Sequence, residues 1–114
     1  MTTAYKILAG VNPAATTWTT VYAAPNSSVD AHAKVITIVI GNQGSTTTFR
    51  LAFLKTGDSE VSPPVRSIPY YDIPLPSADA WVMTIGVTLG PDEKIAIYAG
   101  HGDVVCMVFG AEVT

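Results

Sequence analysis

The sequence predicts an all-β protein: an antiparallel β-sandwich of about seven to eight strands, in a jelly-roll or immunoglobulin-like arrangement. Apolar residues alternate with polar ones in several short segments, as they do in half-buried strands. Turn-forming residues separate these segments about every 8–12 residues, a spacing typical of a sandwich. No window of about 11 residues or more keeps the apolar spacing of a helix. We expect residues 1–114 to form a single domain.

The run Lys34–Ile40 is the candidate central strand. It is rich in Ile and Val, is far shorter than a membrane-spanning helix, and ends at the turn residues Gly41–Ser45. Because both faces of this run are mostly apolar, we expect it to be covered on both sides. Alternation along the strand gives two faces, Ile36, Ile38 and Ile40 on one and Val35, Thr37 and Val39 on the other.

The other expected strands lie on either side of this run. Thr46–Leu54 follows after a short link, so we expect these two strands to form an antiparallel hairpin. Trp81–Leu89 alternates throughout, and its odd-numbered residues are expected to face the core. The remaining predicted strands are Tyr5–Gly10, Thr16–Ala23, an edge strand limited by prolines within Ile68–Pro74, Lys94–Ala99 and Val104–Val113.

Charged residues make up 13% of the chain, about half the usual quarter, and the formal net charge is -3. The Lys and Arg residues are scattered singly, so nucleic acid is not an expected partner. Because charged side chains are depleted in interface cores, the low charge predicts that a partner covers part of the surface. A Thr-rich solvent face on an isolated β domain is the alternative. The N-terminal residues predict no secretion signal, and no membrane partner is expected.

The sequence predicts no metal site and no catalytic residues. His101 and Asp103 lie in a glycine-rich turn, but a metal needs three or four converging ligands, so we interpret them as turn residues. His32 is interpreted as a strand-entry residue, and the single Cys106 as a small core residue. The chain has neither a nucleophile elbow nor a phosphate-binding glycine loop. We therefore expect no enzyme activity, no cofactor and no small-molecule substrate, with a carboxylate pair for glycoside cleavage as the lesser alternative.

Aromatic residues offer two interpretations. They form a sugar-stacking platform, or Trp81 lies in the core while the tyrosines bridge the core and the rim. The stretch Tyr70, Tyr71 and Asp72, set between prolines, is the candidate exposed aromatic site and a candidate subunit or partner contact, since Tyr is enriched in interfaces. The aromatic residues concerned are Trp18, Tyr70, Tyr71, Trp81 and Tyr98.

The order of several segments resembles that of a known group of proteins. These segments are, in chain order, Tyr5–Leu8, Pro13–Thr17, Val21–Tyr22 with Pro25, the Ile-rich strand ending in Asn42, Thr48–Ala52, Tyr70–Asp72, Gly86–Leu89, and Asp92 before Ile95–Ala99. In this order the chain resembles small β-sandwich virion structural proteins of tailed bacteriophages, which occur as capsid cement or decoration proteins and as modules of tail and fibre proteins. The resemblance covers nearly the whole chain and implies no catalytic residue.

The resemblance implies a non-enzymatic component of the virion, made in the host cytoplasm. The leading expectation is a capsid cement protein, a homotrimer that binds over junctions between major capsid subunits and stabilises the shell. Its partners would be copies of itself and the major capsid protein or other virion proteins. The alternatives are a tail, neck or fibre-associated structural protein and a carbohydrate-binding receptor module.

Overall fold

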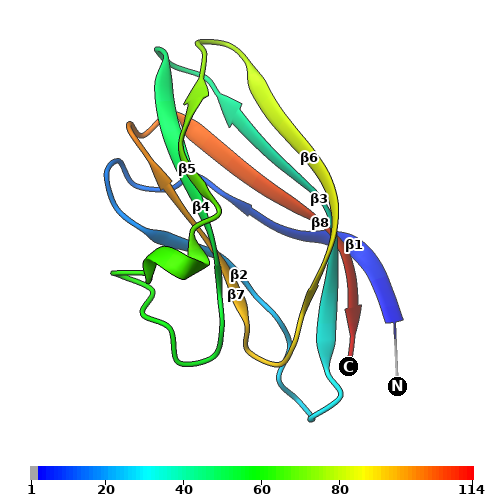
Figure 1. The fold of residues 1–114 in the computed structure, drawn as a ribbon. Coiled ribbons are helices and arrows are strands. Elements are labelled where there is room, and N and C mark those ends of the chain that lie inside the picture. Colours follow the sequence, from blue (N-terminus) through cyan, green and yellow to red (C-terminus); the bar gives the residue numbers. More distant parts are fainter. Residues whose placement is uncertain (1–2) are drawn as a thin grey trace.

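The computed structural model describes residues 3–114 and confirms the all-β sandwich (Figure 1). Met1 and Thr2, which the predicted domain includes, lie outside the described residues. Within residues 3–114, no helix has the length and apolar character needed to cross a bilayer. The elements are β1 (Thr3–Val11), β2 (Thr19–Ala23), β3 (His32–Asn42), β4 (Thr47–Leu54), the 3₁₀ helix η1 (Val65–Ser67), β5 (Tyr70–Leu75), β6 (Ala80–Leu89), β7 (Lys94–Ala99) and β8 (Val104–Val113).

The eight strands form two four-stranded antiparallel sheets, which lie against each other (Figure 1). The first sheet has the order β1-β8-β3-β6, and the second has the order β2-β7-β4-β5. The first strand therefore pairs with the last, the second with the seventh, the third with the sixth and the fourth with the fifth. This nested pairing is the topology of a jelly roll, so the jelly-roll arrangement is present rather than the immunoglobulin-like one.

The expected hairpin between the central strand and Thr46–Leu54 is wrong. β3 pairs with β8 and β6, whereas β4 pairs with β7 and β5, so the link after β3 crosses from one sheet to the other. Stacked sheets lie about 10 Å apart, a distance that a link of four or five residues spans at about 3.3 Å per residue. A short link is therefore compatible with either connection. The turn at Gly100–Asp103 likewise joins strands of different sheets.

Asn42 fixes this crossing. Its side chain is buried, with 4% of its surface exposed. Its Nδ2 group donates to the backbone oxygens of Ser45, Leu75 and Pro76 at 2.8, 3.0 and 3.2 Å. Its Oδ1 atom accepts a hydrogen bond from the Gly44 N–H at 2.9 Å. One amide thus holds the end of β3, the link to β4 and the end of β5 together. Both its N–H group and its oxygen are hydrogen-bonded, as buried polar groups in folded proteins usually are.

The central position of Lys34–Ile40 is confirmed, because β3 lies between β8 and β6. Cover on both faces is not observed. A register shift between Val35 and Thr37 adds a residue to the ladder, so Val35, Ile38 and Ile40 are fully buried while Ile36 is 40% exposed. One face of β3 therefore packs into the sandwich, and the other faces outward.

The core lies between the sheets and follows the predicted alternation in the later strands. In β6, Met83 and Leu89 are buried, and the other odd-numbered residues pack against the core. Cys106 is fully buried, as expected, and burial raises the pKa of its thiol to about 12. A smaller apolar cluster of Ala52, Leu54 and Ala96 lies on the outer face of the second sheet, where Trp18 and Ile68 cover it.

Each of the four edge strands, β1, β6, β2 and β5, carries a register shift against its inner neighbour. Such irregularities twist an edge and hinder pairing with further strands. The predicted edge strand within Ile68–Pro74 is confirmed as β5. In β2, the shift lies between Thr20 and Tyr22, so the consecutive residues Val21 and Tyr22 are both buried and strict alternation fails there.

Candidate interaction surface on the second sheet

The aromatic residues identified in the sequence separate into a core group and a surface group. Trp81 packs in the sandwich against Phe49, with ring centroids 5.1 Å apart, and edge-on against Tyr70 at 5.2 Å. The Tyr70 hydroxyl donates to the Met83 sulfur at 2.9 Å. A platform of all five rings is therefore not formed. Tyr70 contributes packing to the core, and the exposed part of the predicted contact is Tyr71 and Asp72.

A bulge in β5 turns both of these residues outward. Phe49 pairs with Ile73 and Leu51 pairs with Tyr70, so two residues of β5 lie opposite the single residue Arg50 of β4. Asp72 has a φ of 51°, in the left-handed region, where Asp is among the better tolerated residues. The bulge therefore places Tyr71 and Asp72 beside the Arg50 side chain.

Four side chains form a continuous row across the outer face of the second sheet, and we call Trp18, Tyr98, Arg50 and Tyr71 the aromatic row. The Arg50 guanidinium carbon lies 4.1 Å from the centre of the Tyr71 ring and 4.7 Å from that of Tyr98. Tyr98 is the register partner of Arg50 on β7. Its ring centroid is 5.7 Å from that of Trp18, at an interplanar angle of 53°. The row thus runs from the segment before β2, across β7 and β4, to β5.

Asp72 holds the guanidinium in place. Its Oδ1 atom accepts a hydrogen bond from Arg50 Nε at 2.7 Å, and its Oδ2 atom lies 3.5 Å from Nη2. This hydrogen bond is the main cause that raises the pKa of Arg50 above its ordinary value, so Arg50 stays charged. An exposed ion pair alone contributes about 0–1 kcal/mol, but two ring contacts add to it here. The row is therefore ordered before any partner binds.

The row is the accessible part of this sheet face. Tyr71 is 59% exposed, while Trp18, Tyr98 and Arg50 are half-buried. The neighbouring part of the face is covered by loop 55–69, whose Ile68 packs on the small apolar cluster. Trp, Tyr and Arg are the residue types most enriched among the energetically dominant residues of protein interfaces. The Arg50 guanidinium already occupies one face of the Tyr71 and Tyr98 rings, so less ring surface is available for stacking on a sugar. The row is therefore better suited to a protein contact than to a sugar.

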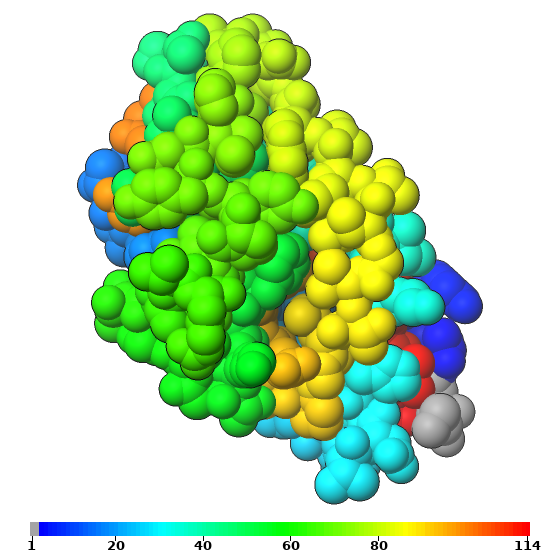
Figure 2. Space-filling view, viewed as in Figure 1, coloured from blue at the N-terminus to red at the C-terminus, as the bar shows by residue number. Residues whose placement is uncertain are grey.

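Loop 55–69 is organised around one carboxylate, that of Asp58. Asp58 accepts hydrogen bonds from the Lys55 N–H at 3.1 Å and the Ser67 hydroxyl at 2.9 Å, and it pairs with Arg66 at 2.9 Å. The hydrogen bond from Ser67 is the largest cause that lowers the pKa of Asp58. These contacts join the two ends of the loop, and Ile68 packs the loop on the small apolar cluster of the sheet. Figure 2 shows this green loop standing beside β6 in yellow, with the surface recessed between them.

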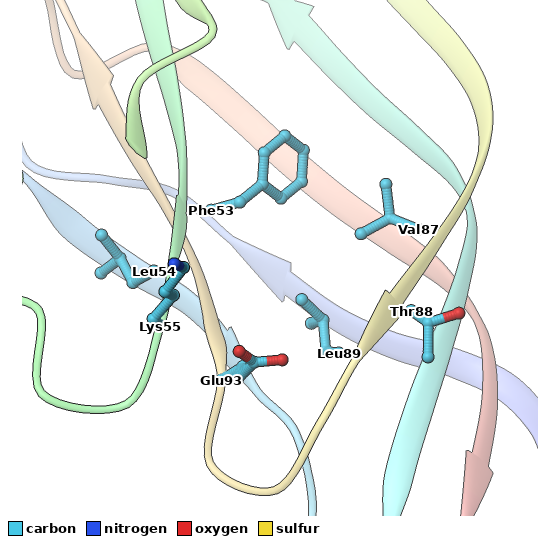
Figure 3. A pocket seen from close by; sticks show the side chains of 7 residues that line it. All are labelled: Phe53, Leu54, Lys55, Val87, Thr88, Leu89 and Glu93. Atoms are coloured by element: carbon cyan, nitrogen blue, oxygen red, sulfur yellow. The ribbon is translucent and has the colours of Figure 1, made fainter. Parts of the chain in front are cut away.

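The recess is an apolar hollow of about 220 Å³ between β4 and β6 (Figure 3). It exists because β5 pairs only with the first part of β4, so Phe53 has no partner on β5 and points toward Val87 across the gap. Glu93 is the acidic group at its mouth, and its carboxylate accepts the Gly90 N–H at 2.6 Å. Small-molecule sites usually measure about 300–1,000 Å³ and contain several converging polar groups. The hollow is smaller than this range and is mostly apolar, so it does not have the features of a small-molecule site.

The predicted turn roles of His101 and Asp103 agree with the geometry. The His101 Nε2 atom lies 2.6 Å from the Ser45 carbonyl oxygen, and its Nδ1 atom accepts the Asp103 N–H at 3.1 Å. Both ring nitrogens are therefore used in backbone hydrogen bonds. Among residues 3–114, no group of three His, Cys, Asp or Glu side chains is placed to hold a metal ion.

A polar cluster closes one end of the sandwich. Glu112 of β8 accepts hydrogen bonds from Lys6 Nζ at 2.8 Å and from the Tyr22 hydroxyl. The hydrogen bond from Lys6, followed by that from Tyr22, lowers the pKa of Glu112. Burial is the main cause that raises the pKa of Tyr22, and Glu112 adds to it. The cluster joins β1, β8 and β2 and therefore has a structural role.

No family model, curated protein or solved structure matches this chain. The resemblance to phage virion proteins stays a prediction from the order of segments. A functional proposal must therefore rest on surface chemistry, of which the aromatic row is the most specific feature.

Proposed function

We propose that this chain is a non-enzymatic virion structural protein of a tailed bacteriophage, acting as a capsid cement or decoration protein. It binds over junctions between major capsid subunits and stabilises the shell, as a homotrimer and without a cofactor. The observation that carries the proposal is the aromatic row, an ordered set of outward-facing Trp, Tyr and Arg side chains on a sheet. The low content of charged residues, 13%, supports a role in assembly.

The row is suited to be the contact with the shell. Tyr71 is its most exposed member, and truncation of such an anchor typically costs about 2 kcal/mol or more of binding free energy. Because the Arg50 side chain is already held by Asp72 and two rings, little side-chain entropy is lost when a partner binds. The charges of Arg50 and Asp72 offset each other, so moderate salt should weaken the contact little.

Stabilisation of the shell follows from mass action. A protein that binds the assembled junction but not the separated subunits shifts the equilibrium toward the assembly, by about 2.7 kcal/mol per site at a free concentration of 100 Kd. The two packed sheets give the bound protein a shape that does not need to reorganise at the junction.

The proposal is tested with capsids stripped of their decoration protein. Purified wild-type chain is expected to bind them saturably and to raise the temperature at which they open. Tyr71→Ala should weaken binding about 30-fold, which corresponds to about 2 kcal/mol. Val29→Ala, which shortens a 90% exposed apolar side chain outside the row, serves as the matched control and should bind as the wild type does. Wild-type binding no stronger than that of an unrelated protein would refute the proposal.

Copy number separates this proposal from a tail, neck or fibre-associated structural protein. A protein placed over an icosahedral shell should be present in numbers on the order of hundreds per particle, whereas an axial component should be present in a handful. A quantitative gel of virions measures this directly. A carbohydrate-binding receptor module would instead bind host polysaccharide, and a titration followed by Trp fluorescence would detect it because Trp18 lies in the row.

A further inference from the structure

The outer face of the first sheet is apolar, and no described segment of the chain covers it. Burial shows which side chains of β8 face outward. Cys106 and Val108 are fully buried, so the alternating residues Met107 and Phe109 point to the outer face. On the edge strands, Ile7 is 57% exposed and Val82 is 61% exposed. We call the outward side chains of Tyr5, Ile7, Val39, Val82, Met107 and Phe109 the apolar face.

Strand register shows that these residues are neighbours. Val39 of β3 pairs with Met107 on one side and with Val82 on the other, which gives a row of three apolar side chains. Ile7 of β1 pairs with Phe109 in the next row. The apolar face therefore extends across all four strands of the sheet. Its second row also contains two uncharged polar residues, because Phe109 pairs with Thr37 and Thr37 pairs with Thr84.

Charge on this face is confined to one end. The rows considered run from the row of Tyr5 and Ala111 to the row of Met107 and Val39. Among the described residues in these rows, the charged outward side chain is Lys34, whose register partners are Ala111 and Thr88. Lys34 thus lies in the end row with Tyr5, which also pairs with Ala111. A charge-free centre with polar groups toward the rim is the composition of an interface core.

We infer that the apolar face is a contact between copies of this chain. Four strands about 4.8 Å apart, with eight paired positions between β1 and β8 and between β3 and β6, present roughly 500 Å² of flat area, so two such faces bury about 1,000 Å². This is the size that a specific protein interface needs to reach. Sheets of this kind pack face to face at about 10 Å through interdigitated side chains, as the two sheets do inside each sandwich. A second copy supplies the matching sheet.

The inference does not depend on the proposed contact with the capsid, but it concerns the same self-association, and a face-to-face pair would replace the homotrimer of that proposal. The aromatic row lies on the outer face of the other sheet, so a copy held through its apolar face still presents its row. In a face-to-face pair the two rows lie on opposite outer faces, so each remains accessible to a partner of its own. Failure of self-association would leave binding of the single chain through the row intact, and the reverse also holds.

The test is the mass of the purified full chain in solution, measured by sedimentation velocity and by light scattering across a concentration series. The wild type is expected to reach the mass of two chains, since one pair of faces closes the contact. Val82→Lys and Ile7→Lys place a charge at opposite edges of the face, on exposed positions where folding should be unaffected. Each is expected to raise the dissociation constant at least about tenfold, because an unpaired charge must be desolvated in the contact.

Thr48→Lys is the control, since it adds the same charge at an exposed position of β4 on the other sheet. It should associate as the wild type does, and circular dichroism should show the same strand signal for all the variants. A wild type that stays a single chain throughout the series would overturn the inference. Association that is unchanged in both Val82→Lys and Ile7→Lys would overturn it as well.

Discussion

Removal of the Asn42 side chain should destabilise the fold more than any other single polar truncation in the β3–β4 link. Asn42→Ala deletes two N–H donors, shared among the carbonyl oxygens of Ser45, Leu75 and Pro76, and one acceptor for the Gly44 N–H. Three net hydrogen bonds at about 1 kcal/mol each give a loss of about 3 kcal/mol. Because the site is buried, the orphaned carbonyls cannot all regain water, so the loss should not fall below this sum.

The assay is equilibrium unfolding in urea followed by Trp fluorescence, with the midpoint and slope fitted to a two-state transition. For a chain of this size, about 3 kcal/mol corresponds to a decrease in Tm of about 10 °C. Asn26→Ala is the matched control, because Asn26 lies exposed in the turn after β2 and should change stability by less than about 0.5 kcal/mol.

Asn42→Asp sharpens the test through its pH dependence. The new carboxylate would face three carbonyl oxygens in a buried site, so its folded-state pKa should rise above its unfolded value near 3.9. A raised folded-state pKa means that the variant is least impaired below that unfolded value and loses stability as pH rises through the folded-state pKa. A loss below about 1 kcal/mol for Asn42→Ala, or no pH dependence for Asn42→Asp, would refute the assignment of Asn42 as the tie between the sheets.

Three further predictions concern the core and its titratable groups. Ile38→Ala should lower the free energy of unfolding by about 2–5 kcal/mol, whereas Ile36→Ala at the bulge should lower it by less than about 1 kcal/mol; similar losses in urea unfolding would contradict the observed register. The pKa of Glu112 is lowered in the folded state, so its contribution to the free energy of unfolding is present above its unfolded-state pKa and is lost as pH falls through its folded-state pKa. Glu112→Gln should therefore make the free energy of unfolding less dependent on pH in the acid range. An unchanged pH dependence would count against the Lys6 contact. Cys106 should resist alkylation in the native protein and react on unfolding, and rapid labelling of the native state would show that the sandwich opens.

Strand positions were largely predictable because they depend on local alternation. Trp81–Leu89, Lys94–Ala99 and Val104–Val113 agree with β6, β7 and β8 within about one residue. The connection from β3 to β4 was not predictable, because the length of the Gly41–Ser45 link fits both a hairpin and a crossing between sheets. The side chain that decides between them, Asn42, makes two of its bonds more than thirty residues away, at Leu75 and Pro76.

The candidate site was predicted in part. Tyr71 and Asp72 were identified as an exposed contact because prolines flank them, and they belong to the observed surface. Arg50 and Tyr98 were missed as partners of that contact. Their meeting requires that β4 pair with both β7 and β5, which is a property of the whole sheet. An outward Arg in an apolar strand was the available signal.

A bulge, rather than a regular part of the strand, produces the exposed end of the aromatic row. In β5, the extra residue turns Tyr71 and Asp72 to the same side as Arg50, and strict alternation would have directed one of them into the core. In β3, the shift between Val35 and Thr37 directs Val35 inward and leaves Ile36 beside the apolar face. A bulge leaves no periodic signal in the sequence, yet it determines which side chains point out of an edge strand or a sheet face. The aromatic row therefore depends on Tyr71 and Asp72, at which alternation fails, and substitutions at these two positions should separate binding through the row from folding.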